Sequence, residues 1–111
     1  MPGQIRTTMK ELTESDFEQF IRTADKPVIV DFWAPWCAPC KSMAKELDMF
    51  SAQYDKVIVA KLNIDEHPNV AQELGIMSIP TIIAFNNGTP EIVVVGAQTK
   101  SSLSEEFAKY I

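Results

Sequence analysis

The sequence has few of the side chains from which metal sites are built. Its 111 residues include only two cysteines and one histidine. A zinc site uses about four nitrogen, sulfur or oxygen ligands, and an iron–sulfur cluster uses about four cysteines unless two chains share it. We therefore expect neither a metal site nor a bound cofactor.

Cationic side chains and long apolar runs are also scarce. The 10 lysines and arginines are outnumbered by 15 aspartates and glutamates, which gives a formal net charge of −5. No basic stripe that would bind nucleic acid is present. Residues 1–8 contain no apolar segment of signal-peptide length, and no later run approaches the roughly 20 apolar residues of a membrane span. We expect no nucleic-acid or membrane partner and a cytoplasmic location.

The apolar content, 46% of the residues, is enough for one folded domain over residues 1–111. Hydrophobic periodicity and turn residues predict alternating helices and strands, followed by a hairpin and a last helix. The expected helices lie between Thr13 and Pro27, over about 38–54, from about 68 to 74, and from 101 or 102 onward. The expected strands are 28–32, 57–63, 81–85 and 91–95. This order predicts an α/β fold whose sheet has a parallel core and an antiparallel hairpin.

Both cysteines lie where the strand 28–32 ends and the long helix begins. The first turn of a helix has free backbone N–H groups and the positive end of the helix dipole, so a thiolate is favoured there. Cys37 precedes the helix, with Lys41 nearby, and is the better candidate for a nucleophile with a low pKa. Cys40 lies about one turn later, where it can resolve a mixed disulfide formed on Cys37.

Other interpretations of the cysteine pair are weaker. A structural disulfide that closes so small a ring restricts the unfolded chain by only roughly 2 kcal/mol. A Cys–His hydrolase would use His67, but it would leave Cys40 without a role. Two charged residues, Asp31 and Lys61, stand in apolar strands, where they are either a buried pair or solvated charges at a sheet edge. Trp36 is either a core residue or, as we expect from its place beyond Pro35, partly exposed.

The residues around the cysteines resemble the active-site signature of thioredoxins, and further landmarks of that family follow in the right order. The matching segments are Trp33-Ala34-Pro35-Trp36-Cys37-Ala38-Pro39-Cys40-Lys41, Val59-Ala60-Lys61-Leu62-Asn63-Ile64-Asp65, Ile79-Pro80-Thr81, Asn87-Gly88 and Val95-Gly96-Ala97. The resemblance spans nearly the whole chain. It implies the thioredoxin fold, a mixed sheet with helices on both faces.

The resemblance also implies roles for individual residues. Cys37 is expected to attack and Cys40 to resolve, with Asp31 as a buried carboxylate that relays a proton and Lys61 as its buried neighbour. Pro80 is expected to be a cis-proline that faces the disulfide. The expected substrate-docking surface consists of Trp36, Ile64, Ile79, Gly96 and Ala97.

The predicted function is therefore that of a monomeric protein-disulfide reductase, which donates electrons to disulfide-containing proteins through the Cys37/Cys40 dithiol. The sequence has no Gly-x-Gly-x-x-Gly nucleotide motif, so a separate thioredoxin reductase is expected to regenerate the dithiol. The alternatives are a more oxidising isomerase or oxidase domain and a binding or chaperone module that uses the same groove. Three residues depart from the commonest pattern of the family: Ala38 and Ser78 replace glycines, and Lys45 replaces a proline.

Overall fold

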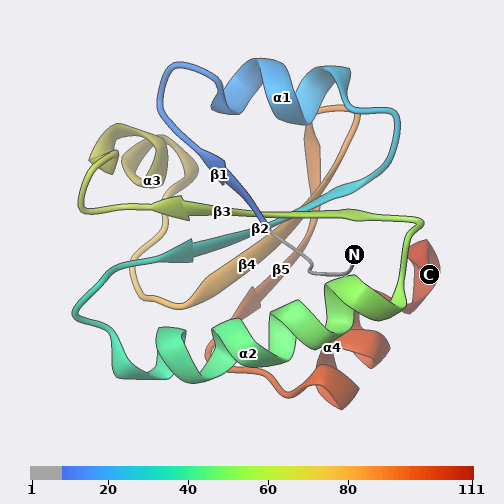
Figure 1. Ribbon diagram of the computed structural model, residues 1–111. Coiled ribbons are helices and arrows are strands. Elements are labelled where there is room, and N and C mark those ends of the chain that lie inside the picture. The colour runs from blue at the N-terminus through green and yellow to red at the C-terminus, as the bar shows by residue number, and fades with distance from the viewer. Residues whose placement is uncertain (1–8) are drawn as a thin grey trace, which may run out of the picture.

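The computed structural model of the chain describes residues 9–111 (Figure 1). The expectation that residues 1–8 form no signal peptide lies outside this range. The described residues form a 5-stranded sheet in the order β1-β3-β2-β4-β5. The strands are β1 (Lys10–Leu12), β2 (Val28–Trp33), β3 (Ile58–Asn63), β4 (Thr81–Asn86) and β5 (Thr89–Val95).

The sheet is mixed, as predicted. Strands β1, β3 and β2 run parallel to one another, whereas β4 is antiparallel to β2 and β5 is antiparallel to β4. The register pairs Phe32 of β2 with Thr81 of β4. The carboxyl end of β2 and the amino end of β4 therefore lie side by side at the same end of the sheet.

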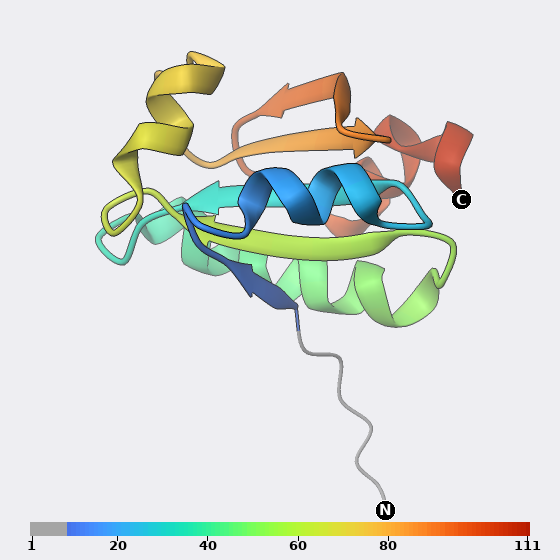
Figure 2. The same ribbon diagram turned by 90° about the horizontal axis from the view of Figure 1, so that it is seen from above.

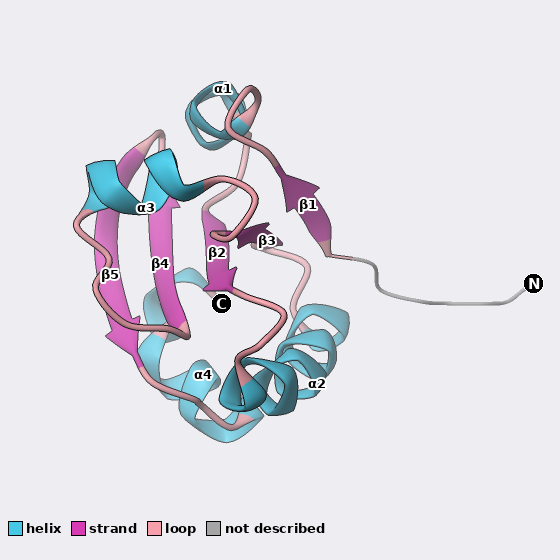
Figure 3. Cartoon of the chain, turned by 90° about the vertical axis from the view of Figure 1, so that its left-hand side faces the viewer, coloured by secondary structure: helices cyan, strands magenta, loops and turns pink. Residues whose placement is uncertain are grey.

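Helices cover both faces of the sheet. Helices α1 (Phe17–Thr23) and α3 (Pro68–Leu74) lie on one face, and α2 (Ala38–Gln53) and α4 (Lys100–Glu106) lie on the other (Figures 2 and 3). A 3₁₀ turn, η1 (Ala108–Tyr110), follows α4. Within the described range, none of these helices has both the length and the apolar character that a membrane crossing requires.

The alternation of side chains along β2 divides the core in two. Val28, Val30 and Phe32 pack in the cluster on the α1/α3 face, and Ile29 packs with Met43, Leu47 and Phe50 on the α2 face. Side chains of one strand alternate between the two faces, so Asp31 and Trp33 point to the same face as Ile29. The long helix that begins at the cysteines therefore covers the charged residue of β2.

Several predicted boundaries are confirmed, and others differ; β5, for example, begins at Thr89 rather than at residue 91. The hairpin turn has Asn87 at φ 54° and Gly88 at φ 84°, which matches the twist of the strands that it joins. Helix α1 begins at Phe17 rather than directly after Thr13, although the Asp16 carboxylate accepts a hydrogen bond from the Thr13 N–H at 2.7 Å. Strand β1 was not predicted, because only Leu12 of its three residues is buried and so short a segment has no readable period.

Candidate active site

The cysteine pair lies at the amino end of α2, as the sequence predicts. Cys37 is the N-cap residue, and its Sγ accepts a hydrogen bond from the Cys40 N–H at 3.2 Å. The two cysteines form a disulfide, with their Cα atoms 5.3 Å apart. Pro39 in the first turn costs the helix little, because the N–H that it lacks has no partner at this position. The amide that now contacts Cys37 Sγ would stabilise a thiolate once the disulfide is reduced.

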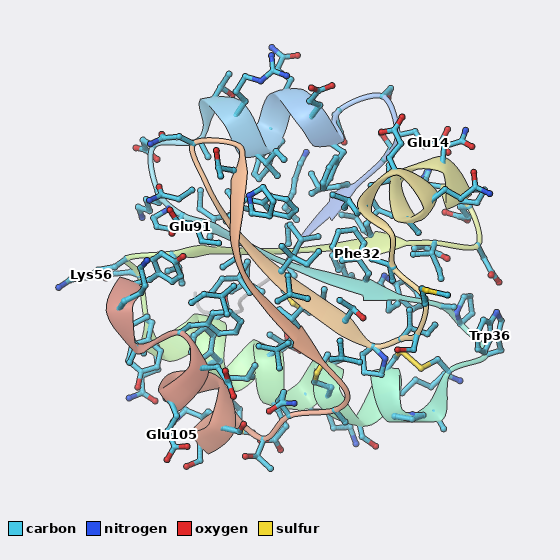
Figure 4. All side chains as sticks on the ribbon, turned by 180° about the vertical axis from the view of Figure 1, so that it is seen from behind. Glu14, Phe32, Trp36, Lys56, Glu91 and Glu105 are labelled. Carbon is cyan, nitrogen blue, oxygen red and sulfur yellow. A yellow bond between two sulfur atoms is a disulfide. The ribbon has the colours of Figure 1, made fainter. Side chains whose placement is uncertain are left out.

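Trp36 stands beside the disulfide at the edge of the molecule (Figure 4). Its side chain is 67% exposed, which confirms the expected partial exposure. The indole Nε1–H donates to both carboxylate oxygens of Asp65, at 3.1 and 3.0 Å. The Asp65 N–H in turn donates to the side-chain oxygen of Asn63 at 2.9 Å. This chain of hydrogen bonds holds an exposed aromatic ring in one orientation, and sequence analysis did not assign Asp65 a role.

A cavity of about 240 Å³ adjoins Trp36. It is lined by Trp36, Ile64, Ile76, Met77, Ser78 and Ile79. Three of the predicted docking residues therefore share one surface. The sequence analysis did not include Ile76 and Met77 in this surface. The signal that could have found them is the presence of two apolar residues in the turn after Gly75, which ends α3.

The other predicted docking residues lie close to Pro80. The Ile79–Pro80 peptide bond is cis, in agreement with the resemblance. Pro80 directly precedes Thr81, which pairs with Phe32 near the carboxyl end of β2. Pro80 therefore lies at the end of the sheet where the chain leaves β2 and continues to the cysteines. The Gly96 N–H donates to the Pro80 carbonyl at 2.9 Å. Gly96 has φ 99°, a backbone conformation that residues other than glycine rarely adopt. The exposed Ala97 follows it.

Asp31 lies behind the cysteine pair and is 2% exposed. It lines a cavity of about 90 Å³ together with Cys40, Lys41 and Lys61, and its Oδ1 has no hydrogen-bond partner among residues 9–111. Burial raises the pKa of Asp31 to about 7, although the positive charge of Lys61 acts in the opposite direction. A carboxyl group with a pKa near neutrality can accept and return a proton under ordinary conditions.

Lys61 differs from the expectation of a buried lysine. It is the register partner of Asp31 on β3, but its side chain is half-buried and its Nζ lies 5.4 Å from the centre of the Trp33 ring. Among residues 9–111, no ion pair joins Lys61 to Asp31. The flexible alkyl chain of lysine can follow the protein surface while the ammonium group stays near water, so Lys61 acts on Asp31 through space rather than by direct contact.

The comparisons with known proteins agree with this geometry. The thioredoxin family model matches residues 8–109. The chain belongs to the thioredoxin family. It is 51% identical over 98 residues to a thioredoxin of Alicyclobacillus acidocaldarius, which covers 87% of this chain and 92% of the relative. It is 45% identical to thioredoxin 1 of a Nostoc species over 91% of this chain and 95% of the relative, and 46% identical to a thioredoxin of Rickettsia felis over 90% and 96%.

Membership of the thioredoxin family and the proximal cysteine pair establish the activity. The protein is a thioredoxin-like protein-disulfide reductase that exchanges its dithiol with substrate disulfides. Its substrates are disulfide-containing proteins, and a reductase partner restores the dithiol.

The three departures from the commonest thioredoxin pattern leave the described site intact. Ala38 is the exposed first residue of α2, and Lys45 is exposed farther along the same helix. The Ser78 carbonyl accepts a hydrogen bond from the Thr81 hydroxyl at 2.6 Å. Ser78 therefore supports the turn that leads into Pro80.

His67 does not complete a hydrolytic site. It precedes α3, and its Nδ1 accepts a hydrogen bond from the Glu14 N–H at 3.3 Å. In the described part of the chain, no group of three or more His, Cys, Asp or Glu side chains is arranged to hold a metal ion.

Proposed function

We propose that Cys37 is the attacking nucleophile and Cys40 the resolving cysteine. The Cys37 thiolate attacks one sulfur of a substrate disulfide, forms a mixed disulfide and displaces the other substrate sulfur as a thiolate. The Cys40 thiolate then attacks Cys37 Sγ, which releases the second substrate sulfur and leaves the Cys37–Cys40 disulfide. The substrate gains the two electrons that the protein dithiol loses. The observation that carries this assignment is the hydrogen bond from the Cys40 N–H to Cys37 Sγ at the start of α2.

Asp31 is the proton acceptor for Cys40 in this proposal. Both residues line the same small cavity, and the buried carboxyl has a pKa of about 7. When this carboxylate takes the thiol proton of Cys40, it generates the resolving thiolate next to the mixed disulfide on Cys37. Lys61 limits the rise of the Asp31 pKa by its positive charge.

Substrate docking is assigned to the apolar surface beside the disulfide. The cavity next to Trp36 accepts apolar side chains of the substrate, and Ile64 and Ile79 form its half-buried wall. Pro80, Gly96 and Ala97 continue the surface at the open end of the β4–β5 hairpin, opposite its Asn87-Gly88 turn. An oxidised substrate segment held there would present its disulfide to Cys37.

The cellular role that we propose is that of a cytoplasmic, single-domain monomer regenerated by a thioredoxin reductase. The lack of a nucleotide-binding motif supports a separate reductase, and the net charge of −5 argues against nucleic acid as a partner. Both cysteines of the 111 residues belong to the active pair, which suits a reducing compartment, where structural disulfides are rare.

The assignment is tested by trapping the mixed disulfide. Cys40→Ser removes the resolving thiol, so we expect covalent adducts with a disulfide-containing protein such as insulin, visible by mass spectrometry and released by a dithiol. Cys37→Ser is the matched control and should form none. Adducts that accumulate on Cys37→Ser but not on Cys40→Ser would reverse the roles of the two cysteines.

A further inference from the structure

Met77 is the most exposed large apolar residue of the described chain. Its side chain is 95% exposed, compared with 48% for Met49, 8% for Met9 and 1% for Met43. Met77 lies in the turn between α3 and β4, with Ile76 half-buried and Ser78 exposed on either side. The thioether sulfur is therefore open to a small oxidant from solvent.

Met77 is also part of the docking cavity, whose wall is otherwise largely apolar. The cavity of about 240 Å³ includes the exposed ring of Trp36 and the isoleucines 64, 76 and 79. A flexible, polarisable thioether in such a wall can adapt to side chains of different shape, which suits a surface that receives many protein substrates. A change in the polarity of this one side chain changes the surface that every such substrate contacts.

We propose that Met77 is an oxidation site, at which a hydroperoxide converts the thioether to a sulfoxide and weakens the docking of protein substrates. A lone pair of the Met77 sulfur attacks one peroxide oxygen, the O–O bond breaks and an S–O bond forms. The proton of the transferred oxygen passes to the departing oxygen, so hydrogen peroxide leaves as water. The sulfur loses two electrons and the peroxide gains them.

The sulfoxide changes docking because it places a strong hydrogen-bond acceptor in the apolar wall. An apolar substrate side chain that covers the sulfoxide would remove its water without supplying a donor, which costs free energy. We expect KM for a protein disulfide to rise by about three- to tenfold. Turnover of a small disulfide that does not fill the cavity should be unchanged, and a methionine sulfoxide reductase should restore KM. This inference rests on the docking surface assigned under the proposed function.

The experiment starts from the disulfide form, in which neither cysteine presents a thiol to the oxidant. The protein is exposed to hydrogen peroxide, the excess is destroyed, and peptide mass spectrometry follows the addition of one oxygen atom to Met77 and Met49. The disulfide is then reduced, and KM and kcat are measured with insulin and with a small aromatic disulfide. Met77→Leu and Met49→Leu are treated in the same way, and each variant is compared with its own untreated sample.

The expected result is faster oxidation of Met77 than of Met49, with a rise in KM for insulin in the wild type and in Met49→Leu but not in Met77→Leu. Oxidation of Met49 first, or an equal rise of KM in Met77→Leu, would overturn the proposal. A Trp36→Ala variant distinguishes a failure of the oxidation proposal from a failure of the docking surface on which it rests. If Trp36→Ala raises KM for insulin but oxidation of Met77 does not, this inference alone fails. If Trp36→Ala leaves KM unchanged, the docking surface and this inference fail together.

Discussion

Replacement of the buried carboxyl by its neutral isostere, Asp31→Asn, should stabilise the protein above neutral pH. In the folded protein the pKa of Asp31 is raised from 3.8 to about 7. Each pH unit of this difference corresponds to about 1.4 kcal/mol, so the ionised carboxylate lowers the free energy of unfolding by about 4 kcal/mol when the pH lies well above 7. The amide side chain of the variant has no charge to bury at any pH.

The effect of Asp31→Asn on the free energy of unfolding should depend on the pH. Because the folded-state pKa is raised, the folded protein binds more protons than the unfolded chain between about pH 4 and pH 7, so stability falls as the pH rises through this range. Below about pH 4 the carboxyl is protonated in both states, and the variant and the wild type should be nearly equal. The advantage of Asp31→Asn should grow from near zero at about pH 4 to about 4 kcal/mol at about pH 8.5.

Urea unfolding of the disulfide form at a series of pH values measures this difference. Asp25→Asn, which removes an exposed carboxylate from the turn before β2, is the matched control and should show no comparable gain. An advantage of Asp31→Asn that is the same at pH 5 and pH 8.5, or a loss of stability at the higher pH, would refute the burial argument. The same variant should slow disulfide reduction most near neutral pH, where the proposed proton transfer operates.

Three further predictions concern other parts of the site. Trp36→Ala should raise KM for insulin by about tenfold with little change in kcat, because it removes an exposed aromatic contact; steady-state kinetics measures this, and a selective loss of kcat would contradict a docking role. Gly96→Ala should lower the free energy of unfolding by about 1–2 kcal/mol, because Gly96 has φ 99°; an unchanged urea midpoint would show that the backbone relaxes there. The Cys37–Cys40 couple should be more reducing than the glutathione pool when equilibrated against a dithiol buffer of known potential; a value well above that pool would indicate oxidase or isomerase chemistry instead.

Local signals accounted for the elements that carry the chemistry. The change from a strand pattern to a helical pattern at Pro35 placed Cys37 at the start of a helix, and Asn87-Gly88 located the hairpin because only a few residues tolerate positive φ. The position of Lys61 was predicted less well. Strand register placed it beside Asp31, but register does not determine where a long flexible side chain ends, and its ammonium group lies over Trp33.

The residues that sequence analysis missed depend on contacts between distant segments. Asp65 became part of the site only through its hydrogen bonds to Trp36, which lies 29 residues earlier in the chain. Met77 lines the cavity beside Trp36 because the turn after α3 packs next to Trp36 and Ile64. Neither contact leaves a periodic or spacing signal in the sequence, because hydrophobic patterns report which side of an element is buried and not what lies opposite it.

The pairing of β2 with β4 has a consequence for the order in which the site is completed during synthesis. Both cysteines belong to the first part of the chain, whereas Pro80 and Gly96 flank the antiparallel hairpin, about 40 or more residues later. The register that joins Phe32 to Thr81 closes a long loop, and such non-local pairing is slow compared with the formation of a helix. A growing chain therefore carries both cysteines before it has the surface to which we assign substrate docking. We therefore expect mixed disulfides to be less selective on the nascent chain than on the folded protein, in which the hairpin has paired.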